Sequence, residues 1–556
     1  MPEPDSDDCF EYTSGKWIYN NTLRHSERRN NFNLPELKRL AAQSIDKSEN
    51  DITKFEKLAE GGFNRTFIIT MQDGFEFVAR IPFPVTEPRS LLIGSEVATM
   101  DYLRSNGLPI PKVFGYSTTT DNPAGTEYIF MELVKGTSLG KIWFDLSEQQ
   151  QTTIITNLVQ LESKLLALKF PAGGSLYYSD DLPEKYPRIP LQNESTANRA
   201  VDDNKKQFCI GPDTSFRLWF GKRLNLDVER GPYRDSFAAL TAGASKEIKY
   251  LEEFGKPLVP FQRLRRELYA YKPQSHLEHL QNLKLYLAIA PYLIPTEPDT
   301  YLERPVIRHP DLQPNNVIVT ENLDVKGLID WQYSTILPLF LQSGIPLSIK
   351  SQDIIEPWKQ PTPPLKPSKI GNNVSKKERL HQEELARKRR LHHEYLKKTA
   401  EINPEHDSAL SERFSKLRRR IWHHVNDPWE GDIVTLKADL IVLSRKWGEI
   451  TGHTDSDIDS ESEVDDTCPI SFSNEEIKEC LRLNAAQADA DDQLRECQDI
   501  VGVGSEGWTP SASFDKAKAR EKKLRAETFD AAETEEERKR LEENWIFDDF
   551  CEDDYT

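Results

Sequence analysis

The sequence of 556 residues predicts an α+β fold, with a small antiparallel sheet first and a larger helical region after it. Three observations lead to this prediction. Apolar runs at residues 65–71 and 75–81 flank the sequence Gln-Asp-Gly, a turn that joins antiparallel strands. From residue 148 onward, most long apolar segments have the spacing of helices. A second hairpin, at residues 317–329, interrupts the helical region and follows a cluster of polar side chains.

The elements of the small sheet are expected in the following order. Residues 34–45 have helical spacing of their apolar side chains, and Asn33 is a suitable N-cap. A strand at residues 55–58 leads to a glycine turn, and the first hairpin comes next. A helix is expected at about residues 91–105, and residues 127–132 are apolar enough for a buried strand.

Helices are expected to dominate the rest of the chain. Their predicted positions are residues 148–168, 245–253, 276–290, 375–400, 410–425 and 433–447. Between the first two of these, residues 170–235 are rich in Pro, Gly, Tyr and Asp and are expected to be an irregular insertion.

Two segments have the composition of connections. Residues 357–367 are rich in proline, and residues 454–466 hold seven acids and no base, which is typical of a flexible linker. The expected division of the chain is an extension, a small lobe, a helical lobe, and an acidic linker with a helical tail. These parts correspond to residues 1–50, 51–134, 135–450 and 451–556.

The composition fits a globular protein that also has polar segments. The chain is too long for one compact domain, and its mean hydropathy of −0.63 goes with 29% charged residues. A formal net charge of −19 argues against nonspecific binding to nucleic acid or to an acidic membrane. No apolar run reaches the roughly 20 residues that a membrane span needs.

The cysteines and the N-terminal sequence bear on location. Six cysteines form no C-x-x-C pair and no metal-ligand spacing, which fits a reduced, intracellular protein. Five acids stand within residues 3–11. Because mitochondrial presequences are poor in acids, these residues favour the cytoplasm.

Three polar residues around the second hairpin form the main candidate site. Asp311 stands five residues before Asn316, and Asp330 follows fourteen residues later at the end of an apolar strand. Phosphoryl transfer uses such a set: the first carboxylate accepts the proton of the acceptor hydroxyl, and the amide and the second carboxylate hold Mg²⁺ against nucleotide phosphates. The hairpin would bring Asn316 and Asp330 together. The alternative is three ordinary loop residues, which the order and spacing of the whole set disfavour.

Two further candidates come from the small sheet. Gly61 and Gly62 lie between the first two strands, where they form either an ordinary turn or a loop whose N–H groups cover nucleotide phosphates. Arg80 lies inside an apolar strand, and a buried charge needs a partner, for which Glu96 is the candidate. We favour a phosphate-positioning pair over an edge-strand arginine in solvent.

Two other motifs have simpler interpretations. The sequence G-x-G-x-x-G at residues 502–507 lacks the preceding strand and the following helix of a dinucleotide site, so an ordinary glycine-rich loop is expected. The basic run at residues 387–390 is compatible with a nuclear signal or a nucleic-acid contact. Acids one turn earlier in the helix favour a solvated face instead, so there is no strong nucleic-acid signal.

Together these residues resemble the aminoglycoside phosphotransferase and choline kinase branch of the protein-kinase-like fold. Within it, residues 327–332, Gly-Leu-Ile-Asp-Trp-Gln, and the following residues 336–340 are similar to fungal phosphotransferase-family proteins, including the altered-inheritance-of-mitochondria group. The resemblance covers about residues 50–450. It implies two lobes joined by a hinge near residues 131–134, and it makes mitochondria the alternative location.

The resemblance also implies roles by position. Asp311 would be the catalytic base, and Asn316 and Asp330 the Mg²⁺ ligands. The residues that would contact ATP are Gly61, Gly62, Arg80, Glu96, Met131 and Leu133. Two residues depart from the family pattern: Arg80 stands where most members carry lysine, and Pro310 replaces a small residue. An arginine is larger and planar, and it binds in a bidentate way.

The sequence therefore predicts an ATP- and Mg²⁺-dependent phosphotransferase that acts on a hydroxyl of a small molecule. The acceptor wall is expected from the helical lobe, including residues 170–290, where no motif identifies the acceptor. The alternative is a pseudokinase that binds nucleotide, or serves as a scaffold, without turnover. In that case the acidic C-terminal region would be its surface for a protein partner.

Overall fold

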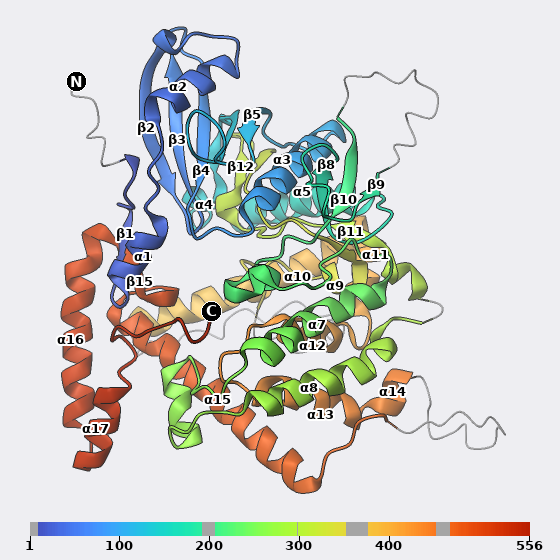
Figure 1. Ribbon diagram of the computed structural model, residues 1–556, viewed down its shortest axis with the longest axis vertical. Helices are drawn as coiled ribbons and strands as arrows, with labels where there is room; N and C mark the ends of the chain where they lie inside the picture. The colour runs from blue at the N-terminus through green and yellow to red at the C-terminus, as the bar shows by residue number, and fades with distance from the viewer. Residues whose placement is uncertain (1–8, 192–205, 297–298, 352–375, 452–467) are drawn as a thin grey trace, which may run out of the picture.

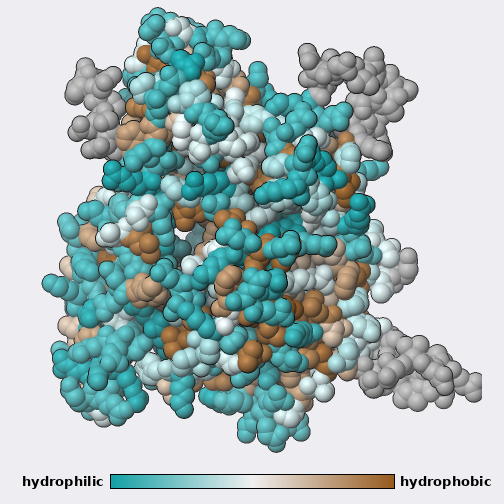
Figure 2. Space-filling view, in the orientation of Figure 1, coloured by the Kyte–Doolittle hydropathy of each residue, from teal (hydrophilic) through white to brown (hydrophobic). Residues whose placement is uncertain are grey.

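The computed structural model describes residues 9–191, 206–296, 299–351, 376–451 and 468–556. An antiparallel sheet with two helices forms a small lobe, and a larger body made mostly of helices lies beside it (Figure 1). This is the α+β architecture that the sequence predicts. On the face shown in Figure 2, hydrophilic residues cover most of the surface, and hydrophobic residues show mainly in patches over the helical body.

Five antiparallel strands form the sheet of the small lobe, in the order β2-β3-β4-β6-β5. In that order their bounds are Ile52–Glu60, Asn64–Met71, Glu76–Pro82, Tyr128–Glu132 and Val113–Ser117. The predicted first hairpin is confirmed, with Thr70 opposite Glu76. Strand β5 is not predicted by the sequence, because all five of its residues are half-buried and no alternation marks them.

The sequence predicts both helices of the small lobe. Helix α2 (Leu34–Gln43) starts at the expected cap, where the Asn33 side chain accepts a hydrogen bond from the N–H of Glu36 at 3.2 Å. Helix α3 (Arg89–Ser105) is buried along most of its length.

These helices pack with different sides of strand β4. Phe77, Ala79 and Ile81 share a hydrophobic core with residues of α2. Val78 lies in the core that contains α3, and Arg80 contacts that helix. Because side chains alternate along a strand, the sequence of β4 itself directs Arg80 toward α3.

Helices form most of the larger body. The bounds are Glu148–Leu166 for α5, Ser236–Phe254 for α7, His276–Ile289 for α8, Lys376–Ile402 for α10, Pro404–Ser411 for α11, Ser415–Asn426 for α12, Val434–Arg445 for α13 and Trp447–Thr451 for α14. The predicted helices are present, but α7 begins before residue 245. Its first residues are mainly small, so they carry little apolar periodicity. Among the described residues, no helix is both long and apolar enough to cross a membrane.

The expectation that residues 170–235 are irregular is wrong for part of this segment. Strands β8 (Ser175–Tyr178), β10 (Phe208–Gly211) and β9 (Ile189–Pro190) form a three-stranded sheet, and α6 (Phe216–Trp219) is a short helix. All four residues of β8 are buried, so the strand shows no alternation, and strands this short leave little pattern in a sequence.

The basic run of α10 packs against the body instead of facing solvent throughout. Arg387 pairs with Glu384 at 2.6 Å and lies over the ring of Phe144. Arg390 reaches Glu148 of α5 at 3.4 Å. The face that was expected to be solvated is thus partly a contact between two helices. The aliphatic part of a long arginine side chain can pack in such a contact while its charged end stays polar.

The glycine-rich sequence at residues 502–507 is a connection, as predicted. Helix α15 (Asn474–Val501) precedes it, and strand β15 (Trp508–Pro510) follows. This order is the reverse of a dinucleotide-binding turn. The proline-rich residues 357–367 and the acidic residues 454–466 lie outside the described parts of the chain.

The two ends of the chain meet on the same side of the molecule. Strand β15 pairs with β1 (Gly15–Trp17), and Lys16 is opposite Thr509. Helices α16 (Phe514–Asp530) and α17 (Glu535–Glu543) extend from this point (Figure 1). A sequence separation of about 490 residues explains why no local pattern predicts this pairing.

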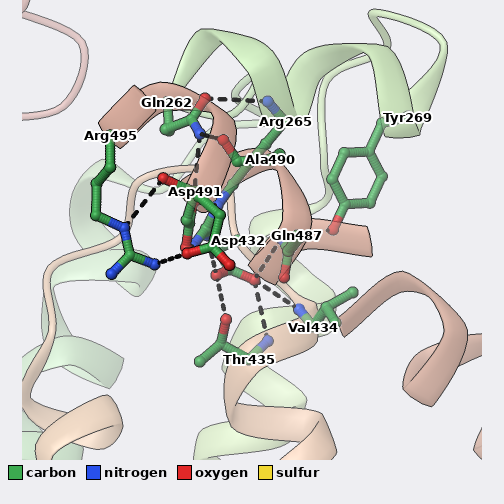
Figure 3. A network of polar contacts seen from close by, with 11 residues as sticks. Gln262, Arg265, Tyr269, Asp432, Val434, Thr435, Gln487, Ala490, Asp491 and Arg495 are labelled. Atoms are coloured by element: carbon green, nitrogen blue, oxygen red, sulfur yellow. Dashed lines mark hydrogen bonds and ion pairs between the residues drawn. The ribbon is translucent and has the colours of Figure 1, made fainter. Parts of the chain in front are cut away.

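One arginine joins α15 to the helical body (Figure 3). Arg265 donates to Asp432 at 2.9 Å and makes two hydrogen bonds to Asp491 of α15, at 2.8 and 2.6 Å. Asp432 in turn caps α13, because it accepts from the N–H groups of Val434 and Thr435. Burial opposes the ionisation of Asp432, but Arg265 and Thr435 outweigh it and lower the pKa of this carboxyl.

Arg265→Gln should therefore loosen α15. Each hydrogen bond to a charged group contributes about 1.5–3 kcal/mol, so the loss should be visible as a lower melting temperature and faster amide exchange along α15. Arg495→Gln is the matched control, because Arg495 makes an exposed pair with Asp492. Equal amide exchange in the two variants would contradict the role of Arg265.

Candidate functional site

The second predicted hairpin is present and places two candidate residues together. Strands β12 (Val317–Val319) and β13 (Val325–Leu328) pair, with Val317 opposite Leu328. Just beyond this pair, the N–H of Ile329 donates to the carbonyl of Asn316 at 3.0 Å. Asn316 and Asp330 therefore flank the same end of the hairpin, as the sequence predicts.

Asp311 and Asn316 are joined by direct hydrogen bonds. The Asn316 amide nitrogen donates to the carbonyl oxygen of Asp311 at 2.9 Å and to its Oδ2 at 3.2 Å. Gln313 donates to the same Oδ2 at 2.5 Å. Asp311 is exposed, and its Oδ1 makes no hydrogen bond within the described part of the chain. The site thus presents one unoccupied carboxylate oxygen on a fixed side chain.

His309 joins the loop of Asp311 to the strand that precedes Asp330. Its Nδ1 accepts from the N–H of Asp311 at 3.1 Å, and its Nε2 lies 2.9 Å from the carbonyl oxygen of Ile329. The neutral tautomer with a proton on Nε2 satisfies both contacts. Burial lowers the pKa of His309, which favours this neutral form. The ring also packs on Trp331, with 4.6 Å between ring centroids.

Arg80 contacts two carboxylates, one from each lobe. Its Nη1 pairs with Glu96 of α3, and its Nη2 lies 2.7 Å from Asp330 Oδ1. Nη2 also donates to Gln332 Oε1 at 2.8 Å. Burial raises the pKa of Glu96 to about 7, against the attraction of the Arg80 charge. The predicted Arg80–Glu96 pair is present, and Asp330 is an additional partner.

Asp330 has an uncommon backbone conformation. Its φ is +68°, in the left-handed region, and Tyr333 in the same turn has a φ of +63°. Such angles are sterically costly for residues other than glycine and are concentrated at functional sites. The side chain of Asp330 is 43% exposed, and its Oδ2 makes no hydrogen bond within the described residues. The turn therefore holds this carboxylate partly exposed, and one of its oxygens makes no hydrogen bond among the described residues.

The glycine loop lies between β2 and β3, and both glycines are exposed. The N–H of Gly61 donates to the carbonyl of Asn64 at 2.9 Å, and a side chain on Gly62 would meet no atom within 4 Å. Ion pairing between Glu60 and Arg65, 2.8 Å apart, closes the base of the loop. The loop is thus an anchored turn with an open outer side.

Met131 and Leu133 lie where β6 ends and the chain crosses to the helical body. Met131 is buried in the core shared by the two lobes, and Leu133 packs against the same core. The next residue, Val134, lies so close to Gly327 of β13 that a side chain there would clash at 2.8 Å. Both candidates therefore lie at the position that the resemblance implies for the hinge.

Two amide side chains at the site were not among the predicted residues. Asn64, from the glycine loop, lies 2.6 Å from Gln332 Oε1, which also contacts Arg80. This connects the loop to the turn after Asp330. The only signal in the sequence is the proximity of each residue to a predicted motif.

An aromatic cluster beside the site was also missed. Phe63 of the glycine loop packs on Tyr333, with 5.3 Å between centroids, and on Phe216 of α6 at 5.9 Å. All three line a cavity of about 820 Å³ that His309 and Pro310 also border. Sequence patterns do not show it, because its walls come from segments far apart in the chain.

Comparison with known proteins identifies the family to which this chain belongs. Residues 54–340 match the profile of the phosphotransferase enzyme family, abbreviated APH. The chain belongs to this family and has its protein-kinase-like bilobal fold.

Individual relatives are fungal. A subtelomeric hrmA-associated cluster protein of Aspergillus fumigatus is 30% identical over 86% of this chain and 93% of its own. The altered inheritance of mitochondria protein 9, mitochondrial, of Yarrowia lipolytica is 24% identical over 92% of this chain and 86% of its own.

The solved gentamicin complex of APH(2″)-IIa is 14% identical, with a TM-score of 0.35, and covers 76% of this chain and 99% of that one. A similarity this low carries no argument about the site.

The contacts of Arg80 with both Glu96 and Asp330 lead to a prediction about pH. In Arg80→Met, Glu96 loses the charge that opposes its raised pKa, while burial and Asp330 still raise it. The folded state would then hold a proton that the unfolded state, with its usual pKa of 4.5, releases. Stability should fall as pH rises from about 4.5 to above 7, by up to about 1.4 kcal/mol per pH unit.

Melting temperatures at about pH 6 and pH 8 test this dependence. On going from about pH 8 to about pH 6, the melting temperature of Arg80→Met should rise by more than that of the wild type. The double variant Arg80→Met/Glu96→Gln should lose the difference, because glutamine does not titrate. A parallel pH response of Arg80→Met and wild type would show that Glu96 is not the titrating group.

Proposed function

We propose that this protein is an ATP- and Mg²⁺-dependent phosphotransferase that acts on a hydroxyl of a small molecule. The observation that carries the proposal is the grouping of Asp311, Asn316 and Asp330 at one end of the β12–β13 hairpin. Family membership supports the general reaction, and the acceptor and the use of ATP and Mg²⁺ are inferred from the site. Phosphoryl transfer depends mainly on positioning and charge stabilisation, which such a site supplies.

Asp311 is the proposed base. Hydrogen bonds from Asn316 and Gln313 hold its Oδ2, which leaves Oδ1 for the acceptor hydroxyl. As the acceptor oxygen bonds to the γ-phosphorus, the bond from that phosphorus to ADP breaks, and the hydroxyl proton passes to Asp311.

Asn316 and Asp330 fit a magnesium ion. The amide nitrogen of Asn316 is engaged by Asp311, so its oxygen is the atom left for a metal. Asp330 Oδ2 is likewise unoccupied among the described residues. Mg²⁺ is usually held by few protein oxygens together with substrate phosphates and water, so two ligands are enough. Once bound, the ion would neutralise charge on the phosphates.

We also propose an intracellular location. All six cysteines are free thiols, which suits a reducing compartment. The name of the Yarrowia lipolytica relative makes mitochondria the alternative to the cytoplasm.

Asp311→Asn tests the proposed base. The substitution keeps the shape of the side chain and removes the proton acceptor, so turnover should fall by roughly 10²-fold or more. The affinity for Mg·ATP, measured by calorimetry, should barely change. Asp330→Asn is the contrasting variant, because it should weaken Mg·ATP binding as well. Turnover near the wild-type rate in Asp311→Asn would overturn the assignment; ATP consumption against a metabolite library supplies the assay.

A nucleotide-binding protein without turnover is the second candidate, and Arg80 is the observation that favours it. Its guanidinium is buried and already contacts Glu96, Asp330 and Gln332. To reach phosphates, it would have to exchange at least one of these contacts. An arginine that is already paired within the protein is compatible with a protein that binds nucleotide or serves as a scaffold, as well as with an enzyme.

Arg80→Lys separates the two candidates. In an active enzyme built around arginine, lysine cannot reproduce the bidentate contacts and should lower turnover. In a decayed site, the smaller ammonium should instead raise Mg·ATP affinity or turnover. Arg89→Lys is the control, since Arg89 lies on the same lobe with a side chain 39% exposed. No effect on affinity or turnover would show that Arg80 does not act on the nucleotide.

A further inference from the structure

The cavity beside Asp311 has a strongly basic wall. His309 and Pro310, the two residues before Asp311, border one side of its volume of about 820 Å³. Helix α12 borders another side, where Lys416, Arg419 and His423 follow a spacing of three and four residues. Residues at this spacing lie on one face of a helix, so α12 turns its basic face to the cavity.

Other cations reach the same cavity from separate elements. Lys350 comes from the segment after α9 (Leu339–Gln342) and Arg217 from α6, and Arg308 precedes His309, just after strand β11 (Pro305–Ile307). Convergence of basic side chains from distant parts of the sequence is the arrangement of an anion site, because a cavity wall concentrates their field.

Some of these cations have carboxylate partners. Arg308 donates to Glu162 at 3.1 Å, and Arg217 lies 3.1 Å from Asp427. Asp213, the one acid that lines the cavity among the described residues, accepts hydrogen bonds from Ser215, and burial raises its pKa. The charges of Arg308 and Arg217 are therefore largely balanced by these carboxylates and do not need a ligand.

Among the described residues, no carboxylate forms an ion pair with Arg419 or Lys350. Arg419 donates to the hydroxyl of Ser343 at 2.5 Å and makes no ion pair within the described residues. The Lys350 ammonium group makes neither a hydrogen bond nor an ion pair in the same part of the chain. Both side chains line the cavity, so their unneutralised charge is available to whatever binds there.

The basic groups also repel one another. Burial and the charge of Arg308 lower the pKa of Arg419 to about 10, although the Glu412 carboxylate opposes this shift. Burial, Lys416 and Arg419 lower the pKa of Lys350, and burial with Arg217 lowers the pKa of His423 to about 4. Like charges held close together cost stability, and such costs are typical of sites that are completed by a ligand of opposite charge.

We propose that this cavity is the acceptor site and that the acceptor is an anion: a hydroxyl compound whose phosphate or carboxylate group lies between Lys350 and Arg419. The proposal rests on the proposed function, since it takes Asp311 as the base for that hydroxyl. Guanidinium groups bind both kinds of anion with paired hydrogen bonds. An acceptor rich in amines, as aminoglycosides are, would be repelled by the same wall.

Direct binding tests the site. With the nucleotide site filled by Mg·ADP, sugar monophosphates, hydroxycarboxylates and the uncharged parent sugars would be titrated by calorimetry. The anionic compounds of one class or both should bind, and the parent sugars should bind more weakly. Arg419→Gln and Lys350→Gln should each weaken anion binding by roughly tenfold or more, the worth of one charge-assisted hydrogen bond. A response confined to phosphates or to carboxylates identifies the group.

Arg413→Gln is the matched control, because Arg413 precedes α12, is 67% exposed and does not line the cavity. Its anion affinity should equal that of the wild type. Melting temperatures of both cavity variants should show that they remain folded, so that a loss of anion binding reports the lost charge. Binding that is unchanged in both cavity variants, or no anion binding to the wild type, overturns the proposal.

Turnover separates this proposal from the proposed function. If an anion binds in an Arg419-dependent way but the protein consumes no ATP in its presence, the anion site is supported and the phosphotransferase proposal fails. If a neutral or amine-bearing compound is phosphorylated in an Asp311-dependent way while no anion is, the phosphotransferase stands and the anionic acceptor is overturned.

Discussion

The position of the site depends on one buried cation, Arg80. A charge inside an apolar strand must be paired, and the alternation along β4 leaves only the side of α3 for its partners. Glu96 fixes α3 against the sheet, and Asp330 ties the sheet to the helical body through the same guanidinium. The Arg80 contacts thus fix the position of one lobe relative to the other at Asp330, the candidate metal ligand. Asp330 reaches Arg80 from a left-handed backbone, so its turn accepts strain at this contact.

The parts of this arrangement that could be predicted from sequence are those set by nearby residues. A two-strand hairpin returns the chain over about a dozen residues, so the closeness of Asn316 and Asp330 follows from the apolar runs between them. The strand alternation that directs Arg80 toward α3 is equally local. Asn33 caps α2 for the same reason: the hydrogen bond spans three residues. The roles of these residues in metal and nucleotide binding stay predictions.

The parts that could not be predicted depend on distant segments. The pairing of β1 with β15 and the joining of α13 to α15 by Arg265 bring together residues with no shared periodicity. Strands β8, β10 and β9 form a small sheet, and they are too short or too buried to show alternation in the sequence. The basic spacing on α12 can be read in the sequence, but nothing there shows that Lys350, His309 and Pro310 line the same cavity. A helix with basic residues on one side is usually just solvated.

The charge of the cavity shows why membership of a family does not identify the acceptor. The whole chain carries −19, yet the wall beside Asp311 is basic, so the overall charge says nothing about the local field. In the proposed function, the hairpin residues position the nucleotide phosphates. The basic wall, which we propose to be the acceptor site, is built from α12, α6 and the segment after α9, outside the hairpin. Function is defined by such sites rather than by the fold. Under this proposal, specificity is expected to follow Arg419 and Lys350, which form no ion pair among the described residues.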